Sequence, residues 1–247
     1  MLGVPDRIRA CLFDLDGVLT QTASVHAAAW QEMFDSYLRQ RASRTGERFV
    51  PFDPVADYDA YVDGRPRADG TRTFLASRGI TLPEGGPDDP AGTETISGLS
   101  TKKNQIVLRR IAAGGVAAFP GSVRYVRAVR DAHLPCAVVS ASANCRAMLT
   151  GAGLDGLFDV IIDGTVAEAE QLAGKPAPDT YLAAARRVHL PPGQCAVYED
   201  ALAGVAAGRA GGFGWVVGVD RTGQADALRA EGADVVVQDL AELLGQQ

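Results

Sequence analysis

The sequence has 247 residues, a length that suits one large domain or a core with a smaller companion. Hydrophobic residues form 47% of it, enough for a sizeable core, and the formal net charge is -6. This acidic balance argues against a broad basic face, so we expect no nucleic-acid partner. Apolar runs of about ten residues at most are too short to span a bilayer, so we expect no membrane partner.

Short apolar runs recur along the chain and predict strands buried on both faces of a parallel sheet. These runs cover residues 8–13, 134–139, 160–162, 195–198, 214–219 and 234–237. Helical patterns between them cover residues 122–133, 144–152, 178–188, 203–210 and 225–232. Strands that alternate with helices predict an α/β core with a doubly wound, Rossmann-like parallel sheet.

A gap of about a hundred residues separates the first predicted strand from the second, and no strand pattern falls within it. Helical patterns in the gap cover residues 23–38, 69–78 and 102–113, with a loop over 80–98. We therefore predict a helical cap domain inserted after the first strand. The expected division is 1–22 with 117–247 for the core and 23–116 for the cap.

The four cysteines are scattered, without the spacing of a metal site. Cys11 and Cys136 lie inside predicted strands, which favours buried, reduced thiols. Residues 1–9 contain no apolar stretch of the signal-peptide kind. We expect a cytoplasmic protein.

Two carboxylates, Asp14 and Asp16, follow the first predicted strand. Open α/β sheets bind their ligands at the carboxyl ends of the strands. One carboxylate there could be a nucleophile that forms an aspartyl-phosphate, and the other a general acid and base. A plain Asp-Gly turn leaving the strand is the alternative.

Three later segments place polar side chains after further strands or before a helix. Ser140 could donate to a phosphate oxygen, although serine is also a common helix cap. Lys175, between glycine and proline, supplies a local positive charge, although it could be a solvated surface lysine. Glu199 and Asp200 would add oxygen ligands suited to Mg²⁺, unless Asp200 only caps the following helix.

Together these residues resemble the haloacid dehalogenase superfamily over essentially the whole chain. Its four signature motifs are matched by Asp14-x-Asp16-Gly17, Ser140, Lys175 and Glu199-Asp200. The resemblance implies Mg²⁺-dependent phosphoryl transfer with Asp14 as nucleophile and Asp16 as general acid and base. The metal would be held by Asp14, the backbone carbonyl of Asp16 and Asp200, with Glu199 supporting it through water.

Within that superfamily the chain is most similar to the β-phosphoglucomutase-like branch. The similarity lies in Thr22, His26 and Trp30 after the first motif, in the segments 140–144 and 173–179, and in the cap segment 62–67. By resemblance, Thr22 and His26 assist Asp16 during catalysis. The implied substrate-binding and phosphate-binding residues are Trp30, Arg65, Arg67, Ser140, Ala141, Asn144 and Lys175. Ala143 departs from the pattern, because the branch has a lysine there.

This resemblance implies exchange of β-glucose 1-phosphate and glucose 6-phosphate by a monomeric enzyme. The alternative is a phosphatase that hydrolyses a sugar phosphate or another small phosphomonoester. The spacing of His26 and Trp30 also suits simple helix packing, and Arg65 and Arg67 could belong to a solvated face. A non-catalytic binding module is disfavoured because both aspartates of the first motif are present.

Overall fold

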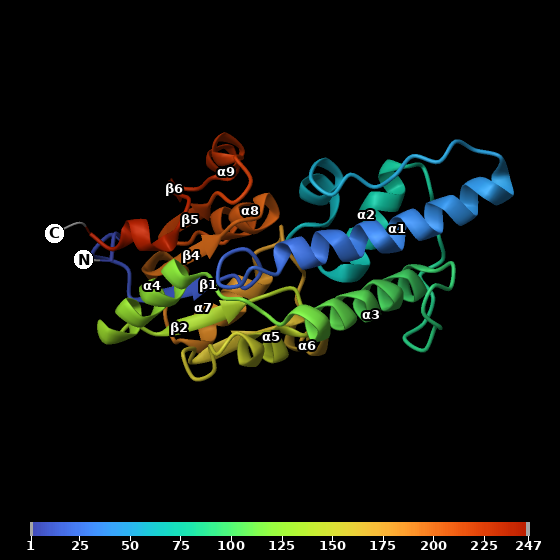
Figure 1. The fold of residues 1–247 in the computed structure, drawn as a ribbon. Coiled ribbons are helices and arrows are strands. Elements are labelled where there is room, and N and C mark those ends of the chain that lie inside the picture. Colours follow the sequence, from blue (N-terminus) through green and yellow to red (C-terminus); the bar gives the residue numbers. More distant parts are fainter. Residues whose placement is uncertain (1, 246–247) are drawn as a thin grey trace. The chain divides into compact units, whose positions relative to one another are not determined.

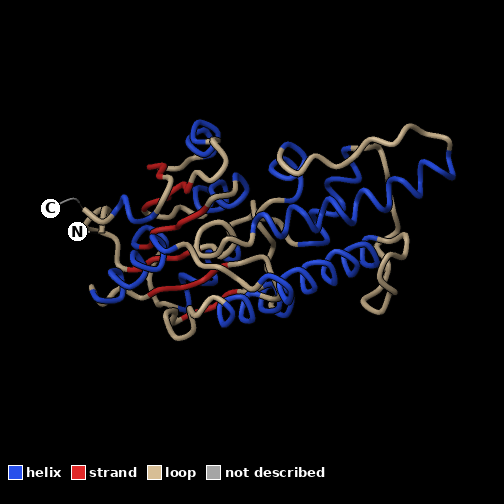
Figure 2. Tube along the Cα trace, in the orientation of Figure 1, coloured by secondary structure: helices blue, strands red, loops and turns tan. Residues whose placement is uncertain are grey.

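The computed structural model describes residues 2–245, and the chain divides into two compact units (Figure 1). The first unit comprises Met1–Gln21 and Val116–Gln247, and the second comprises Thr22–Gly115. Within the described residues, every strand of the sheet belongs to the first unit (Figure 2). The second unit is built of helices and loops.

The first unit is organised around a parallel sheet with the strand order β3-β2-β1-β4-β5-β6. Its strands are β1 (Ala10–Phe13), β2 (Cys136–Val139), β3 (Val160–Ile162), β4 (Cys195–Glu199), β5 (Trp215–Val219) and β6 (Val235–Val237). Leu12 of β1 aligns with Ala137 of β2 and with Val197 of β4. The strand order reverses at β1, so the carboxyl ends of these three strands border the crevice where such sheets bind ligands.

Helices cover both faces of this sheet, which confirms the predicted doubly wound fold. They are α4 (Pro120–Asp131), α5 (Cys145–Gly151), α6 (Gly164–Ala169), α7 (Asp179–Arg187), α8 (Leu202–Ala210) and α9 (Ala225–Glu231). Tyr181 of α7 and Val205 of α8 pack in one buried cluster with Leu12. On the opposite face, Tyr125 of α4 meets Phe13 edge-on, with ring centroids 6.3 Å apart.

Three short elements of the first unit were not predicted. They are α6 and the 3₁₀ turns η2 (Pro192–Gln194) and η3 (Leu240–Leu243). The helix α6 is only six residues long and begins with an Asp163 side chain that accepts from the backbone N–H of Val166. Elements of three to six residues are too short to show a 3.6-residue period, which explains the omission.

The second unit contains α1 (Ala23–Thr45), the π-helical turn η1 (Tyr58–Val62), α2 (Arg67–Ser77) and α3 (Ile96–Gly114). A stack of aromatic rings forms its core: the Phe34 ring lies 5.1 Å from Trp30 and 4.1 Å from Phe74. This burial of aromatic surface holds α1 against the rest of the unit.

The helices of the second unit are longer than predicted. The helix α1 continues past residue 38 and ends where Gly46 adopts a left-handed conformation at φ 75°. The helix α3 begins at Ile96 because the Thr95 hydroxyl accepts from Gly98 N at 2.9 Å. The prediction of a loop over 80–98 and a helix from 102 was therefore wrong at that boundary. A threonine cap lies outside the apolar pattern that placed the helix.

All four cysteines are buried and unpaired, which confirms the prediction made for Cys11 and Cys136. No helix within residues 2–245 combines the length and the apolar character needed to cross a membrane.

Candidate active site

The turn that follows β1 carries the two carboxylates of the first motif. Asp14 is 6% exposed, and its backbone N–H donates to the Tyr198 carbonyl at 2.9 Å. Gly17 takes φ 85°, a left-handed conformation that lets the chain reverse directly after Asp16. The turn closes with a hydrogen bond from Gly17 N to Thr20 O at 2.8 Å. Asp14 and Asp16 thus lie at the carboxyl end of a central strand.

Lys175 is the cationic centre of this region. Its Nζ lies 2.5 Å from Asp14 Oδ1, 2.5 Å from Glu199 Oε1 and 3.1 Å from the carbonyl oxygen of Val139. The side chain is 2% exposed and lies over the Tyr181 ring, 4.9 Å from its centroid. An ammonium with three oxygen partners is fixed, so a solvated surface lysine is the wrong description of Lys175.

The ionisation of this pair is set by burial and by the surrounding charges. Burial raises the pKa of the Asp14 carboxyl. The Lys175 ammonium lowers this pKa, and the negative charges of Glu199 and Asp16 raise it. Burial also works against the charged form of Lys175, but Asp14 and Glu199 together outweigh it and raise the pKa of the ammonium. Lys175 therefore stays protonated at neutral pH.

Glu199 and Asp200 stand at the end of β4, the strand beside β1. Glu199 is fully buried, and its Oε1 also accepts from the Tyr181 hydroxyl at 2.8 Å. A Cβ at position 204 would lie 1.9 Å from the Glu199 carboxyl carbon, so only glycine fits beside it. In the same way, a Cβ on Gly17 would lie 1.7 Å from Asp200 Oδ2. Two glycines thus make room for two carboxylates.

One oxygen from each of Asp14, Glu199 and Asp200 lies within 4.8 Å of the others, and we call these three residues the carboxylate cluster. Lys175 can balance only one of their three negative charges. A divalent cation would balance the remaining two, and carboxylate oxygens are the ligands that Mg²⁺ prefers. The cluster therefore fits a metal ion of this kind.

Ser140 follows β2 next to this cluster, because Lys175 bonds to the carbonyl of the preceding residue. It is 2% exposed, and its Oγ accepts from Ser142 N at 3.1 Å. The Ser142 hydroxyl in turn accepts from Asn144 N at 3.1 Å. Gly164 packs closely on this turn, since a Cβ there would lie 2.8 Å from the Ala141 carbonyl oxygen. The segment 140–144 is thus a compact turn at the edge of the cluster.

In the second unit, His26 belongs to a small polar group on α1 and α3. His26 Nδ1 lies 2.8 Å from Lys103 Nζ, and that ammonium lies 4.7 Å from the centroid of the Trp30 ring. Trp30 is 3% exposed and stacks on Phe34, which places it in the aromatic core of the unit. Thr22 precedes α1, and its carbonyl accepts from His26 N at 2.9 Å.

Arg67 is the first residue of α2, and its Nη1 lies 3.4 Å from the carbonyl of Ser100 on α3. Ser100 and Lys103 are three residues apart and therefore share one face of α3. The same helix thus anchors Arg67 and holds the partner of His26. Arg65 lies two residues before α2, where its backbone N–H donates to Val62 O at 3.3 Å.

Two residues of these groups were missed by the sequence reasoning. Lys103 was noted only as part of a helix candidate, and its contact with His26 joins residues 77 positions apart. Tyr181 belongs to a predicted helix, where an aromatic residue at helical spacing indicates a core position and no more. Its position two residues after Asp179, close behind the Lys175 loop, was the available signal.

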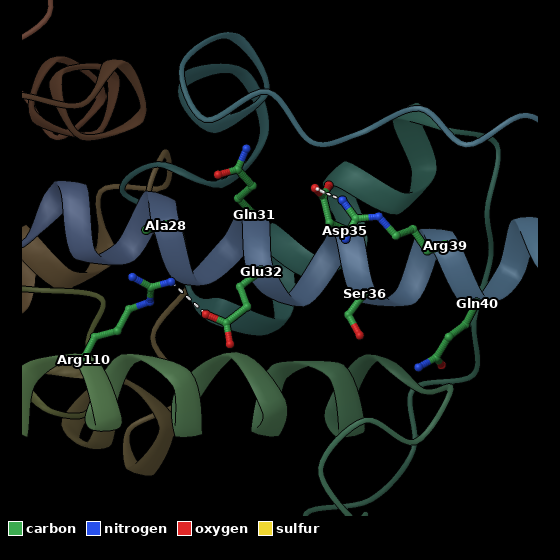
Figure 3. A pocket seen from close by; sticks show the side chains of 8 residues that line it. All are labelled: Ala28, Gln31, Glu32, Asp35, Ser36, Arg39, Gln40 and Arg110. Carbon is green, nitrogen blue, oxygen red and sulfur yellow. Dashed lines mark hydrogen bonds and ion pairs between the residues drawn. The ribbon is translucent and has the colours of Figure 1, made fainter.

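A groove of about 550 Å³ lies along α1 and is lined by residues of α1 and α3 (Figure 3). Glu32 pairs with Arg110 and Arg109 of α3, at 2.7 and 2.8 Å, and Asp35 pairs with Arg39 at 3.4 Å. The Glu32 pairs join α1 to α3, whereas the Asp35 pair lies within α1, so we regard the groove as the junction of these two helices.

Comparison with known proteins extends these observations. A model of the haloacid dehalogenase-like hydrolases matches residues 8–212. The chain is 56% identical to a β-phosphoglucomutase of Mycobacterium bovis over 99% of this chain and 94% of the relative. A crystal structure of a β-phosphoglucomutase from Clostridium difficile matches with a TM-score of 0.74 at 24% identity, covering 96% of this chain and 93% of that one. A hydrolase from Pseudomonas syringae matches with a TM-score of 0.75 at 23% identity, covering 96% of each chain. The two structures bear on the fold alone.

Proposed function

The chain belongs to the haloacid dehalogenase-like hydrolase family, and from that premise we propose that it is a Mg²⁺-dependent phosphomutase converting β-glucose 1-phosphate to glucose 6-phosphate. The observation that carries this proposal is the 56% identity to a β-phosphoglucomutase over nearly the full length of both chains. The carboxylate cluster and Lys175 supply the groups that such a reaction needs. We place the enzyme in the cytoplasm as a monomer.

The proposed reaction begins at Asp14. Its carboxylate attacks the phosphorus atom and forms an aspartyl-phosphate, while the Lys175 ammonium and the Ser140 hydroxyl stabilise the transferring oxygens. The carboxylate cluster and the Asp16 carbonyl would hold Mg²⁺, which would supply further charge neutralisation when bound. Asp16 gives a proton to the leaving sugar oxygen, and later takes one from the hydroxyl that receives the phosphoryl group. The amides of Ala141 and Asn144 border the phosphate.

We propose that residues 23–116, which nearly coincide with the second unit, form a cap that excludes water from the aspartyl-phosphate. Arg67 binds the distal phosphate of the sugar through two N–H donors of its planar guanidinium, and Arg65 assists in binding this phosphate. His26 Nδ1 lies 2.8 Å from Lys103 Nζ, and by resemblance to the family His26 and Thr22 assist Asp16. Trp30 supports the Lys103 ammonium.

A second candidate is a phosphatase that uses water as the acceptor. The family model that matches residues 8–212 describes hydrolases, and both reactions use the same core carboxylates. The difference lies in what accepts the phosphoryl group from Asp14.

One assay separates the two candidates. The protein is incubated with Mg²⁺, β-glucose 1-phosphate and a trace of the 1,6-bisphosphate, and both glucose 6-phosphate and inorganic phosphate are measured. A mutase yields glucose 6-phosphate without free phosphate. Stoichiometric release of phosphate would assign the protein to the phosphatases, and neither product would exclude glucose phosphates as substrates.

A further inference from the structure

The loop that follows β5, residues 220–224, reaches two parts of the active site; we call it the β5 loop. Asp220 makes it rigid, because the Asp220 Oδ1 accepts from the backbone N–H groups of Thr222, Gly223 and Gln224 at 3.2, 2.7 and 2.8 Å. A carboxylate that accepts three backbone N–H groups fixes the local chain direction. The loop is therefore a firm base for the side chains it carries.

Arg221 extends from the β5 loop to the turn after β1. Its Nε donates to the carbonyl of Gly17 at 2.7 Å, and its Nη1 donates to the carbonyl of Gln238 at 2.6 Å. The guanidinium carbon lies 3.6 Å from the centroid of the Phe119 ring. The Arg221 guanidinium stacks on an aromatic ring and donates to two separate carbonyls, and a lysine ammonium cannot make this set of contacts. Arg221 thus ties the turn of Asp16 to the residue that follows the edge strand β6.

Gln224 extends from the same loop to the end of β4. Its Nε2 donates to the carbonyl of Asp200 at 3.2 Å. Asp200 also lies against the turn after β1, because its Oδ2 occupies the space where a side chain on Gly17 would begin. The Asp200 side chain therefore lies close to the backbone of Gly17, the residue that Arg221 anchors.

We propose that Arg221 and Gln224 are positioning residues that set the Asp16 turn and the Asp200 carboxylate at their working separation. The inference rests on the proposed phosphoryl-transfer function. Arg221 fixes the carbonyl of Gly17, the residue that directly follows the acid–base residue, so it acts on the proton-transfer step. Gln224 fixes the backbone of a cluster carboxylate, so it acts on metal binding. Neither residue touches the reacting atoms.

The test compares Arg221→Lys and Gln224→Met with a control, Arg229→Lys. Arg229 is exposed on α9 and pairs with Asp226. Three quantities are measured for each: kcat and KM at saturating Mg²⁺, the dissociation constant for MgCl₂ by calorimetric titration without substrate, and the melting temperature.

We expect Arg221→Lys to lower kcat about tenfold while the Mg²⁺ dissociation constant stays within about twofold. We expect Gln224→Met to weaken Mg²⁺ binding about tenfold while kcat recovers at saturating Mg²⁺. The control should match the wild type. A loss of kcat and Mg²⁺ affinity in equal proportion in both variants would overturn the proposal. So would a lowered melting temperature with unchanged kinetics, which is the signature of a simple structural brace.

The proposed function can fail separately from this inference. If the wild type hydrolyses p-nitrophenyl phosphate but does not convert β-glucose 1-phosphate, the mutase assignment is wrong. The kcat values of Arg221→Lys and Gln224→Met are then measured with p-nitrophenyl phosphate as the substrate. The Mg²⁺ dissociation constants are measured without any substrate, so they do not depend on the sugar. A wild type that binds no Mg²⁺ would overturn the role of Gln224 directly.

Discussion

Replacing Lys175 with methionine removes the ammonium from the centre of the site and keeps a side chain of similar length. Lys175 bonds two buried carboxylates, Asp14 and Glu199, each at 2.5 Å. Removing one partner of a buried ion pair leaves uncompensated charge and typically costs about 3–5 kcal/mol. That is a large share of the free energy of unfolding of an ordinary domain, which is ~5–15 kcal/mol. We expect Lys175→Met to be inactive and markedly less stable at pH 7.

The pH dependence of this loss identifies its cause. Burial already raises the pKa of Asp14, and removing the Lys175 ammonium that opposes this shift raises it further. Protonation then relieves the repulsion, so the loss of stability is larger at pH 7 and shrinks as the pH falls. Urea unfolding of the wild type and of Lys175→Met, in EDTA and at several pH values, measures this difference in the free energy of unfolding. The exposed Arg186→Met, which also removes one positive charge, should change stability by less than about 0.5 kcal/mol. A Lys175→Met protein as stable as this control at pH 7 would refute the reasoning.

Three further outcomes are expected. Asp16→Asn should lower kcat by about 10²–10⁴-fold, with unchanged circular dichroism, because the acid–base group is lost and the fold is not. Gly17→Ala should weaken Mg²⁺ binding in a calorimetric titration and cost about 1–3 kcal/mol, because its φ is 85° and its Cβ would collide with Asp200. Burial raises the pKa of the Cys11 and Cys136 thiols to about 12, so the folded state favours the neutral thiols. That stability is complete below about pH 9 and should fall by about 1.4 kcal/mol per thiol for each further pH unit, a decline that urea titrations at pH 8 and 10 would detect.

The fold of the first unit was predictable because its signal is local. Strands buried on both faces read as continuous apolar runs, and the run that includes Cys136 to Val139 contains β2 as observed. The boundaries were less predictable. The start of α3 depends on a hydrogen bond from Gly98 N to the Thr95 hydroxyl, and the end of α1 depends on the backbone conformation of Gly46. Capping residues of this kind are not part of the spacing of apolar residues from which the helices were predicted.

The grouping of the site residues in the first unit followed from topology. Residues that come after adjacent parallel strands meet at one edge, and Asp14, Lys175 and Glu199 are bonded there. The supporting contacts were beyond prediction, because each joins distant positions through side-chain geometry. Arg221 reaches Gly17 across 204 positions, and Lys103 reaches His26 across 77. A single sequence contains no pairwise signal of that kind.

The most direct test of the account is the fate of the phosphoryl group on Asp14. Radiolabelled β-glucose 1,6-bisphosphate is mixed with the protein and Mg²⁺, quenched at short times, and the labelled peptide is identified by mass spectrometry. We predict label on the peptide containing Asp14, and its transfer to glucose phosphate when β-glucose 1-phosphate is added. Label absent from Asp14, or released only as inorganic phosphate when the sugar is added, would contradict the account.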